Sequence, residues 1–340
     1  MKAYGSDKRL PIDNPDSIFE FEVPKPTALG HDILVRVEAI SVNPVDVYDR
    51  GSNIKKGADP KVIGWDAFGV VDAIGADVTL FQPGDKVYYA GAYDRPGTNS
   101  DFQLVDERLV GNAPTTLSPA EIAAMPLTAL TAWESLFEQL AIEPSDHAKN
   151  VGKTILIIKG AGGVGSIATQ LAHLAGLTVI ATASRDASIA WTLAHGADQT
   201  VNHRHDLVKQ VRELGYHEVD YILELNDLTR HWHEITELIK PDGQIVSTTG
   251  STTPVKLIDL KSKRAKFAWE WMYTKSFYHT ATMITQHDIL NRVAQLLDSG
   301  QLKSTLNTTL SPISAQNLRR AHQIVGSKHA IGKVVITDLI

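Results

Sequence analysis

Cysteine is absent from this chain of 340 residues. Disulfide bonds, thiolate nucleophiles, iron–sulfur clusters and cysteine-ligated zinc are therefore excluded. Long apolar runs are also missing, so no segment is suited to span a bilayer, and residues 1–7 lack the apolar core of a signal peptide. We expect a cytoplasmic protein.

An excess of positive charge is missing as well. The net charge of −6 argues against broad binding to nucleic acid or to anionic membranes. The one notable cluster of positive charge, at residues 261–266, is typical of a solvated face. The content of 43% hydrophobic and 21% charged residues is typical of a globular protein, and the length suggests two domains or one elaborated domain.

The most informative feature that is present is the glycine-rich run at residues 160–165. Residues 154–158 before it form a continuous apolar, β-branched stretch typical of a buried strand. After it, apolar residues recur at helical spacing until Gly176, where a helix would end. In this context Gly160, Gly162 and Gly165 form the dinucleotide-binding fingerprint, in which backbone amides and the helix dipole hold a pyrophosphate.

Strands and helices alternate after this fingerprint. The pattern predicts strands at 178–183, 199–201, 219–223 and 244–247, with helices ending near 195, 214 and 239. This rhythm is typical of a doubly wound parallel sheet, the Rossmann α/β fold. The chain closes with helices predicted at 288–297 and 314–325 and a strand at 333–337, which we expect to return to the first domain.

The first 125 residues are predicted to be mainly β. Alternating or apolar segments predict strands at 33–40, 70–74 and 86–90, separated by glycine, proline and aspartate turns. Ser118, Pro119 and Glu121 then match a helix start, with serine at the cap and glutamate three residues later. A second helix is expected from about 127 to 140.

The end of the second strand of the nucleotide-binding unit indicates which cofactor is used. An acidic residue there binds the ribose hydroxyl of NAD, whereas arginine accommodates the 2′-phosphate of NADP. Ser184 and Arg185 stand at this position, and a guanidinium matches phosphate oxygens in bidentate geometry. Asp186 is interpreted as an N-cap or helix-dipole partner. We predict NADPH, the alternative being an exposed surface arginine.

Several separated segments together resemble the medium-chain dehydrogenase/reductase superfamily. Within it the chain is most similar to the zinc-free quinone oxidoreductase branch that includes zeta-crystallin, and to bacterial proteins called zinc-type alcohol dehydrogenase-like. The matching segments are Asn43-Pro44-Val45-Asp46 with Arg50-Gly51, Gly64-Trp65-Asp66, Gly84-Asp85-Lys86-Val87, residues 126–133 and residues 332–335.

The resemblance implies a mainly β, GroES-like catalytic domain at residues 1–125, a Rossmann NADP-binding domain at 126–274 and a C-terminal segment at 275–340 that returns to the catalytic domain. It also implies cofactor contacts beyond the fingerprint. These candidates are Thr128, Gly160, Gly162, Gly163, Val164, Gly165, Ser184, Arg185, Leu225, Thr248 and, more weakly, Lys333. Four aromatic residues are candidates for an apolar substrate wall: Trp65, Tyr89, Tyr93 and Trp133.

The alcohol dehydrogenase branch holds catalytic zinc with a cysteine and a histidine, and this chain has Asn43 and Trp65 at those positions. Neither supplies a thiolate or imidazole ligand, so we predict no zinc site of the family kind. Two histidine pairs, His203 with His205 and His231 with His233, are interpreted as surface histidines. Without a Lewis acid, alcohol oxidation is disfavoured.

These observations predict an NADPH-dependent reductase of quinones or α,β-unsaturated carbonyls. The resemblance implies a homodimer, and residues 253–258 after the fifth strand are expected to supply the exposed strand edge through which it pairs. Asn43 and Tyr48 are the candidate donors to a developing oxyanion. Two alternatives stay open for them, because Asn43 also suits a turn before proline and solvent can replace Tyr48 as proton donor. The rival functions are a non-catalytic, crystallin-like NADPH-binding protein and, less favoured, a zinc alcohol dehydrogenase.

Overall fold

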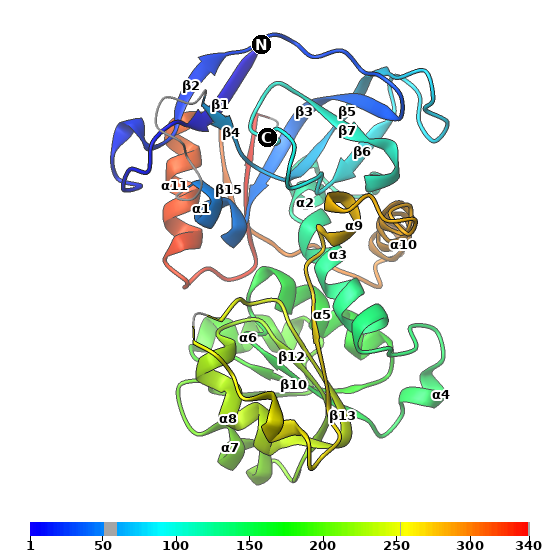
Figure 1. The fold of residues 1–340 in the computed structure, drawn as a ribbon, viewed down its shortest axis with the longest axis vertical. Helices are drawn as coiled ribbons and strands as arrows, with labels where there is room; N and C mark the ends of the chain where they lie inside the picture. Colours follow the sequence, from blue (N-terminus) through cyan, green and yellow to red (C-terminus); the bar gives the residue numbers. More distant parts are fainter. Residues whose placement is uncertain (51–59, 252, 339–340) are drawn as a thin grey trace. The chain divides into compact units, whose positions relative to one another are not determined.

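The computed structural model describes residues 1–50, 60–251 and 253–338, and Gly51 of the matched segment lies outside this range. The chain folds into two compact units. The first combines Met1–Leu130 with Tyr273–Ile340, and the second is Thr131–Met272. The architecture is α/β, with a parallel Rossmann sheet in the second unit and a GroES-like β domain in the first (Figure 1).

The second unit contains a six-stranded sheet in which every pairing is parallel. Its strand order is β11-β10-β9-β12-β13-β14, the 3-2-1-4-5-6 order of dinucleotide-binding sheets. The strands are β9 (Thr154–Ile158), β10 (Thr178–Thr182), β11 (Gln199–Val201), β12 (Val219–Glu224), β13 (Ile239–Ser247) and β14 (Lys266–Trp269).

Helices cover this sheet because alternate strand residues point to opposite faces. Leu156 of β9 and Ile180 of β10 share one core cluster with Leu207 of α7 and Trp232 of α8. The helices of the unit are η3 (Glu134–Gln139), α4 (His147–Asn150), α5 (Gly163–Leu174), α6 (Asp186–Ala194), α7 (Leu207–Glu213), α8 (Leu228–Leu238) and η4 (Leu257–Leu260).

The first unit is built on a seven-stranded sheet ordered β15-β16-β3-β5-β6-β8, with β7 also paired to β3. A smaller sheet has the order β2-β1-β4. The strands are β1 (Lys2–Ser6), β2 (Phe19–Glu22), β3 (Asp32–Val42), β4 (Lys61–Val62), β5 (Asp66–Ile74), β6 (Lys86–Tyr89), β7 (Phe102–Asp106), β8 (Val110–Asn112), β15 (Leu306–Leu310) and β16 (Lys333–Thr337).

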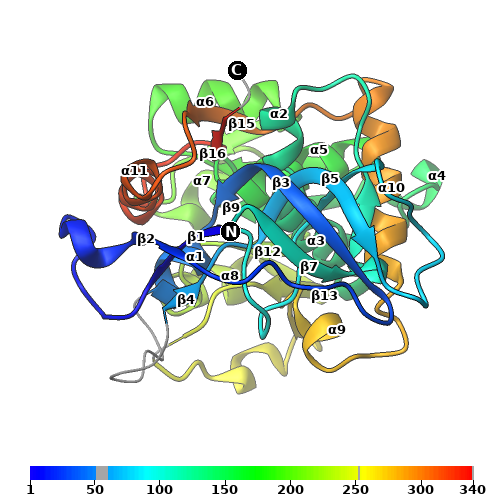
Figure 2. The same ribbon diagram turned by 90° about the horizontal axis from the view of Figure 1, so that it is seen from above.

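Two long helices flank the seven-stranded sheet, α10 beside β8 and α11 beside β16 (Figure 2). Leu318 and Ala321 of α11 are buried against Ile40 and Val334. The helices of this unit are η1 (Pro15–Ser17), α1 (Pro44–Arg50), η2 (Glu107–Leu109), α2 (Pro119–Ala123), α9 (Thr274–Phe277), α10 (Thr285–Asp298) and α11 (Ala315–Gly326), while α3 (Pro126–Trp133) crosses the boundary between the units.

Local signals predicted several boundaries correctly. The Ser118 side chain accepts from the Glu121 amide while the Glu121 carboxylate accepts from the Ser118 amide, which is the predicted capping box. The helix expected from 127 to 140 is instead α3 followed by the π-helical η3. We also expected residues 253–258 to form the strand at the sheet edge, and this was wrong. The edge strand is β14.

Within the described residues, no helix combines the length and the apolar character that crossing a bilayer requires.

Candidate active site

A buried ion pair links three strands of the first unit. Antiparallel pairing sets Ser41 of β3 opposite Asp66 of β5, and Val42 of β3 opposite Val334 of β16. This register brings the ends of the three strands together, so Lys333 reaches Asp66 with an Nζ–Oδ2 distance of 2.7 Å. The two side chains are 3% and 0% exposed. Such burial is tolerated only where the charges are paired and hydrogen-bonded.

Asn43 completes this arrangement. Its Nδ2 donates to Asp66 Oδ2 at 2.7 Å, and its Oδ1 accepts a hydrogen bond from Lys333 Nζ. Asp66 also accepts from Ser41 Oγ at 2.8 Å and, through its other oxygen, from the Leu127 amide at 2.7 Å. Asn43 is 1% exposed, so these contacts fix both ends of its amide.

A second carboxyl group lies close to this network. Asp46, in the first turn of α1, accepts from the Asn43 backbone amide at 2.7 Å through Oδ2. Its Oδ1 has no hydrogen-bond partner among the described residues. Burial raises the pKa of Asp46 to about 7, even though that hydrogen bond and the Lys333 charge lower it.

Aromatic rings gather beside the network. Trp65 is 1% exposed, donates from Nε1 to the Ala92 carbonyl at 3.2 Å and stacks on Tyr93, with ring centroids 5.5 Å apart and planes 9° apart. Tyr273 contacts both rings. The Tyr93 hydroxyl donates to Asp49 Oδ1 at 3.0 Å.

Tyr48 and Lys333 occupy different settings from those that their predicted roles suggest. Tyr48 is 72% exposed on α1. Lys333, a candidate cofactor contact, has its ammonium engaged by Asp66 and Asn43. Thr128 is buried in α3, where its hydroxyl donates to the Met125 carbonyl at 3.2 Å.

Two of the four residues predicted to form a substrate wall make other contacts than the Trp65–Tyr93 stack. Tyr89 is fully buried in the core of the seven-stranded sheet, with Val35 and Val87 among its neighbours. Trp133 lies in the second unit, where its ring packs edge-on against Phe137 at 4.7 Å. Trp65 and Tyr93 are the pair that the structure brings together as a stack.

The fingerprint glycines of the second unit form a tight turn between β9 and α5. A Cβ on Gly165 would lie 2.3 Å from the Lys159 carbonyl oxygen, and one on Gly160 would lie 2.8 Å from the Ala181 side chain. Gly162 is the N-cap residue of α5 and has no such close contact. The first and third glycines therefore allow close packing. A Cβ at the second would clash with nothing, and this glycine precedes the helix that Gly163 and Val164 begin.

Arg185 follows β10 at the N-cap position of α6, where its amide donates to Ser188 Oγ at 3.0 Å. Ser184 is half-buried beside it, and Asp186 is the first acidic residue of the helix.

At the end of β10, Thr182 Oγ1 contacts His203 Nδ1 at 3.2 Å. Burial, with the charges of His231, Arg204, Arg230 and Lys159, lowers the pKa of His203 to about 4. Lys159, Arg204 and Arg230 therefore bring positive charge near the end of β10.

Leu225 and Thr248 directly follow β12 and β13, as predicted. They flank Glu224, which is fully buried and accepts from Ser247 Oγ at 2.8 Å and from the amides of Asn226 and Asp227 at 2.6 Å each. The Thr248 amide donates to the Glu224 carbonyl at 3.2 Å. The carboxylate therefore fixes the loops that follow the two strands.

The histidine pairs are not all on the surface. His231 is 1% exposed and His203 is half-buried, whereas His205 and His233 are exposed, so the prediction was wrong for the first two. Within residues 1–50, 60–251 and 253–338, no three metal-ligating side chains gather into a site. The Asn43 amide contacts the Asp66 carboxylate and the Lys333 ammonium. This set of groups does not fit zinc.

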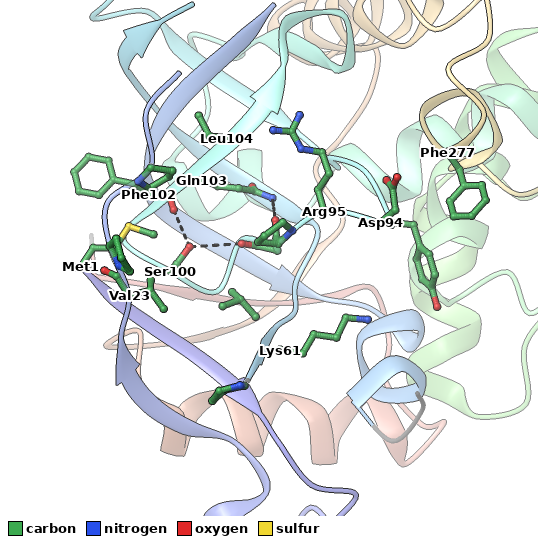
Figure 3. A pocket seen from close by; sticks show the side chains of 17 residues that line it. Met1, Val23, Lys61, Asp94, Arg95, Ser100, Phe102, Gln103, Leu104 and Phe277 are labelled. Atoms are coloured by element: carbon green, nitrogen blue, oxygen red, sulfur yellow. Dashed lines mark hydrogen bonds between the residues drawn. The ribbon is translucent and has the colours of Figure 1, made fainter. Parts of the chain in front are cut away.

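A pocket of about 650 Å³ opens in the first unit (Figure 3). Tyr93 is the predicted substrate-wall residue that lines it, together with Lys61 and Phe277. Lys61 is ion-paired with Asp49 of α1.

Four residues of the candidate site were not predicted from the sequence: Lys61, Asp49, Asp66 and Glu224. Asp66 lay within a matched segment, but nothing local indicated that it is buried.

Comparison with known proteins places the chain among dehydrogenases. Residues 30–124 match the alcohol dehydrogenase GroES-like domain, and residues 195–336 match the zinc-binding dehydrogenase family. A zinc-type alcohol dehydrogenase-like protein from Staphylococcus aureus is 42% identical over 336 residues, covering 99% of each chain.

Two further proteins are similar at greater distance. The 2-methylene-furan-3-one reductase of Solanum lycopersicum is 28% identical, covering 93% of this chain and 74% of its own. The crystal structure of Escherichia coli quinone oxidoreductase complexed with NADPH has a TM-score of 0.84 at 24% identity, covering 99% of this chain and 100% of its own.

Proposed function

The chain belongs to the medium-chain dehydrogenase/reductase superfamily of oxidoreductases, and from this we propose that it is a zinc-independent, NADPH-dependent reductase of quinones or α,β-unsaturated carbonyls. The observation that carries the proposal is the Lys333–Asp66–Asn43 network. Its Asn43 stands where, by the resemblance, zinc-dependent relatives have the cysteine ligand, and the Lys333 ammonium contacts Asn43 there.

The residues of the second unit fit a dinucleotide. A Cβ on Gly162 would make only ordinary van der Waals contacts, at 3.5 Å or more, and Gly162 caps the N-terminus of α5, where backbone amides and the helix dipole favour a pyrophosphate. We assign the 2′-phosphate to Ser184 and Arg185, supported by the positive charge that Lys159 and Arg204 bring near the end of β10. Thr128, Leu225 and Thr248 are assigned to the rest of the cofactor.

When bound, the reduced nicotinamide supplies a hydride. One quinone, one NADPH and one proton would give one hydroquinone and one NADP⁺, and an enone would give its saturated ketone. The chain's own residues would orient the acceptor and stabilise its developing oxyanion. Tyr48 offers an exposed phenol for this purpose. Asn43, whose Nδ2 already donates to Asp66, has one remaining amide hydrogen for it, and the ion pair fixes its orientation.

We further propose that residues 1–125 and 275–340 form the catalytic domain, that residues 126–274 form the NADP-binding domain, and that the protein is a cytoplasmic homodimer. The quinone and enone acceptors are supported by the names of the Escherichia coli and Solanum lycopersicum proteins.

Steady-state NADPH oxidation with a panel of small quinones and enones tests the function, with and without a strong chelator. We expect turnover that the chelator leaves unchanged. NADPH binding without turnover of any acceptor would favour the non-catalytic alternative. Activity that is lost with the chelator and restored by zinc would favour an alcohol dehydrogenase.

A further inference from the structure

The pocket of about 650 Å³ is lined mainly by apolar side chains of the first unit. They come from β4, β7, α9 and connecting segments: Val23, Val62, Pro96, Phe102, Leu104 and Phe277. Figure 3 shows Val23 and Phe102 at one end and Phe277 at the other. This volume lies within the usual range for sites that hold a small organic ligand.

The cations that line the pocket are already neutralised. Lys61 is ion-paired with Asp49, and Arg95 donates to both carboxylate oxygens of Asp32 at 2.7 and 2.8 Å. An anionic ligand would have to compete with these carboxylates. Together with the Asp94 carboxylate, which also lines the pocket, these ion pairs disfavour an anionic occupant.

Two uncharged polar side chains of the pocket wall, Ser100 and Gln103, donate to backbone carbonyls. Ser100 Oγ donates to the Phe102 carbonyl at 2.9 Å, and Gln103 Nε2 donates to the Pro96 carbonyl at 2.9 Å. A polar ligand would lose its hydration and gain few replacements, whereas an apolar one gains from burial. The occupant that fits is a hydrocarbon chain.

One wall of the pocket adjoins the candidate oxyanion donor. Tyr93 lines the pocket, and its hydroxyl donates to Asp49, the residue that follows Tyr48 on α1. Burial, the Asp49 carboxylate and the nearby Tyr48 together raise the pKa of Tyr93 to about 12. A carbonyl group at Tyr48 would thus lie close to the end of the pocket that Tyr93 forms.

We infer that this pocket binds an alkyl or prenyl tail of the substrate, so that the preferred acceptors are quinones or enones carrying such a chain. The inference rests on the proposed function and adds to it a substrate class.

A series of 2-alkyl-1,4-benzoquinones tests this inference, from methyl through butyl to octyl, each assayed with NADPH below its aggregation limit. Burial of a methylene group contributes up to about fourfold in binding. We expect kcat/KM to rise with tail length by up to that factor per carbon until the pocket is filled.

Two variants fill the pocket without touching the donors. In Val23→Trp and Leu104→Trp we expect the dependence of kcat/KM on tail length to disappear. Leu29→Trp is the matched control, since Leu29 is 72% exposed and does not line the pocket. This variant should keep the dependence of the unmutated protein.

The outcomes separate the two proposals. Turnover of the methyl compound with no gain from longer tails would overturn the inference and leave the proposed function standing. A gain that persists in both folded tryptophan variants would overturn it as well. No turnover of any quinone or enone would overturn the proposed function and, with it, this inference.

Discussion

Lys333 Nζ lies 2.7 Å from Asp66 Oδ2 in a part of the interior where the two side chains are 3% and 0% exposed. The pair joins β16, which lies near the C-terminal end of the chain, to β5. It also fixes Asn43, because both charged groups hydrogen-bond to its amide. Stability and the orientation of a candidate donor therefore depend on the same contact.

Removing one partner of this pair should destabilise the protein strongly. We expect Lys333→Met to lower the free energy of unfolding by about 3–5 kcal/mol, because it leaves the Asp66 carboxylate buried and uncompensated. Lys86→Met, at an exposed lysine of β6, is the control and should change the free energy of unfolding by less than about 0.5 kcal/mol. Urea titration measures the free energy of unfolding of both variants. Adding Asp66→Asn should recover part of the loss, and failure to do so would contradict the pairing argument.

The choice of cofactor depends on Arg185. We expect Arg185→Ala to lose roughly 1.5–3 kcal/mol of NADPH affinity with little change for NADH, because only NADPH carries the 2′-phosphate. Calorimetric titration with both cofactors measures this difference. Arg212→Ala, on α7, is the control and should bind both as the unmutated protein does. Equal affinity of the unmutated protein for NADPH and NADH would refute the assignment.

Turnover should depend on the two candidate donors. Loss of one preorganised donor costs roughly 10²–10³ in turnover, and replacement by water reduces the effect. We expect Asn43→Ala to approach this range. Tyr48→Phe should lose less, because Tyr48 is 72% exposed and water can reach its position.

Tyr278→Phe is the matched control for Tyr48, since Tyr278 is a 68% exposed tyrosine of the same unit. All three variants are compared in kcat and KM with one quinone and one enone. Full turnover in both Asn43→Ala and Tyr48→Phe would mean that hydride transfer relies on proximity alone.

Acid should destabilise the protein through His322. This residue of α11 is 1% exposed, and neither ring nitrogen finds a partner in the part of the chain that the structure describes. Burial, and then the Arg50 charge, lower the pKa of His322 to about 3. An unfolded histidine binds its proton near pH 6.5, so stability is lost as the pH falls from about 6.5 toward 3.

His322 is expected to change the free energy of unfolding by at most about 1.4 kcal/mol per pH unit. His322→Leu should flatten the dependence of unfolding free energy on pH between 5 and 7, and His217→Leu, at an exposed site, should leave it unchanged. An unaltered slope in His322→Leu would show that other groups set the acid sensitivity.

The homodimer is expected to form through the edge of the six-stranded sheet. β14 ends that sheet, and Trp269 on it is 53% exposed. An unpaired strand edge can add a symmetry-related strand. Light scattering at micromolar concentration should report a dimer, which Trp269→Lys weakens and Leu193→Lys, on α6, does not. A monomeric unmutated protein would contradict this prediction.

The glycine run and the alternation of strands and helices were enough to predict the Rossmann unit. Its turn geometry is local, because Gly160 and Gly165 are needed by backbone atoms a few residues away or in the next strand. Ser118 and Glu121 were predictable for the same reason, since a capping box involves only neighbours. Residues 253–258 failed as a strand because β pairing depends on distant partners.

The sequence by itself determined the fold class, the glycine cradle for a dinucleotide and the lack of zinc ligands at residues 43 and 65. Only the tertiary structure decided that Lys333 pairs with Asp66 across 267 positions of sequence, that Tyr89 lies in the core and that Tyr93 lines a pocket. The physical reason is that residue type and spacing encode backbone conformation. Burial and charge pairing arise from strand register, which the whole sheet sets together.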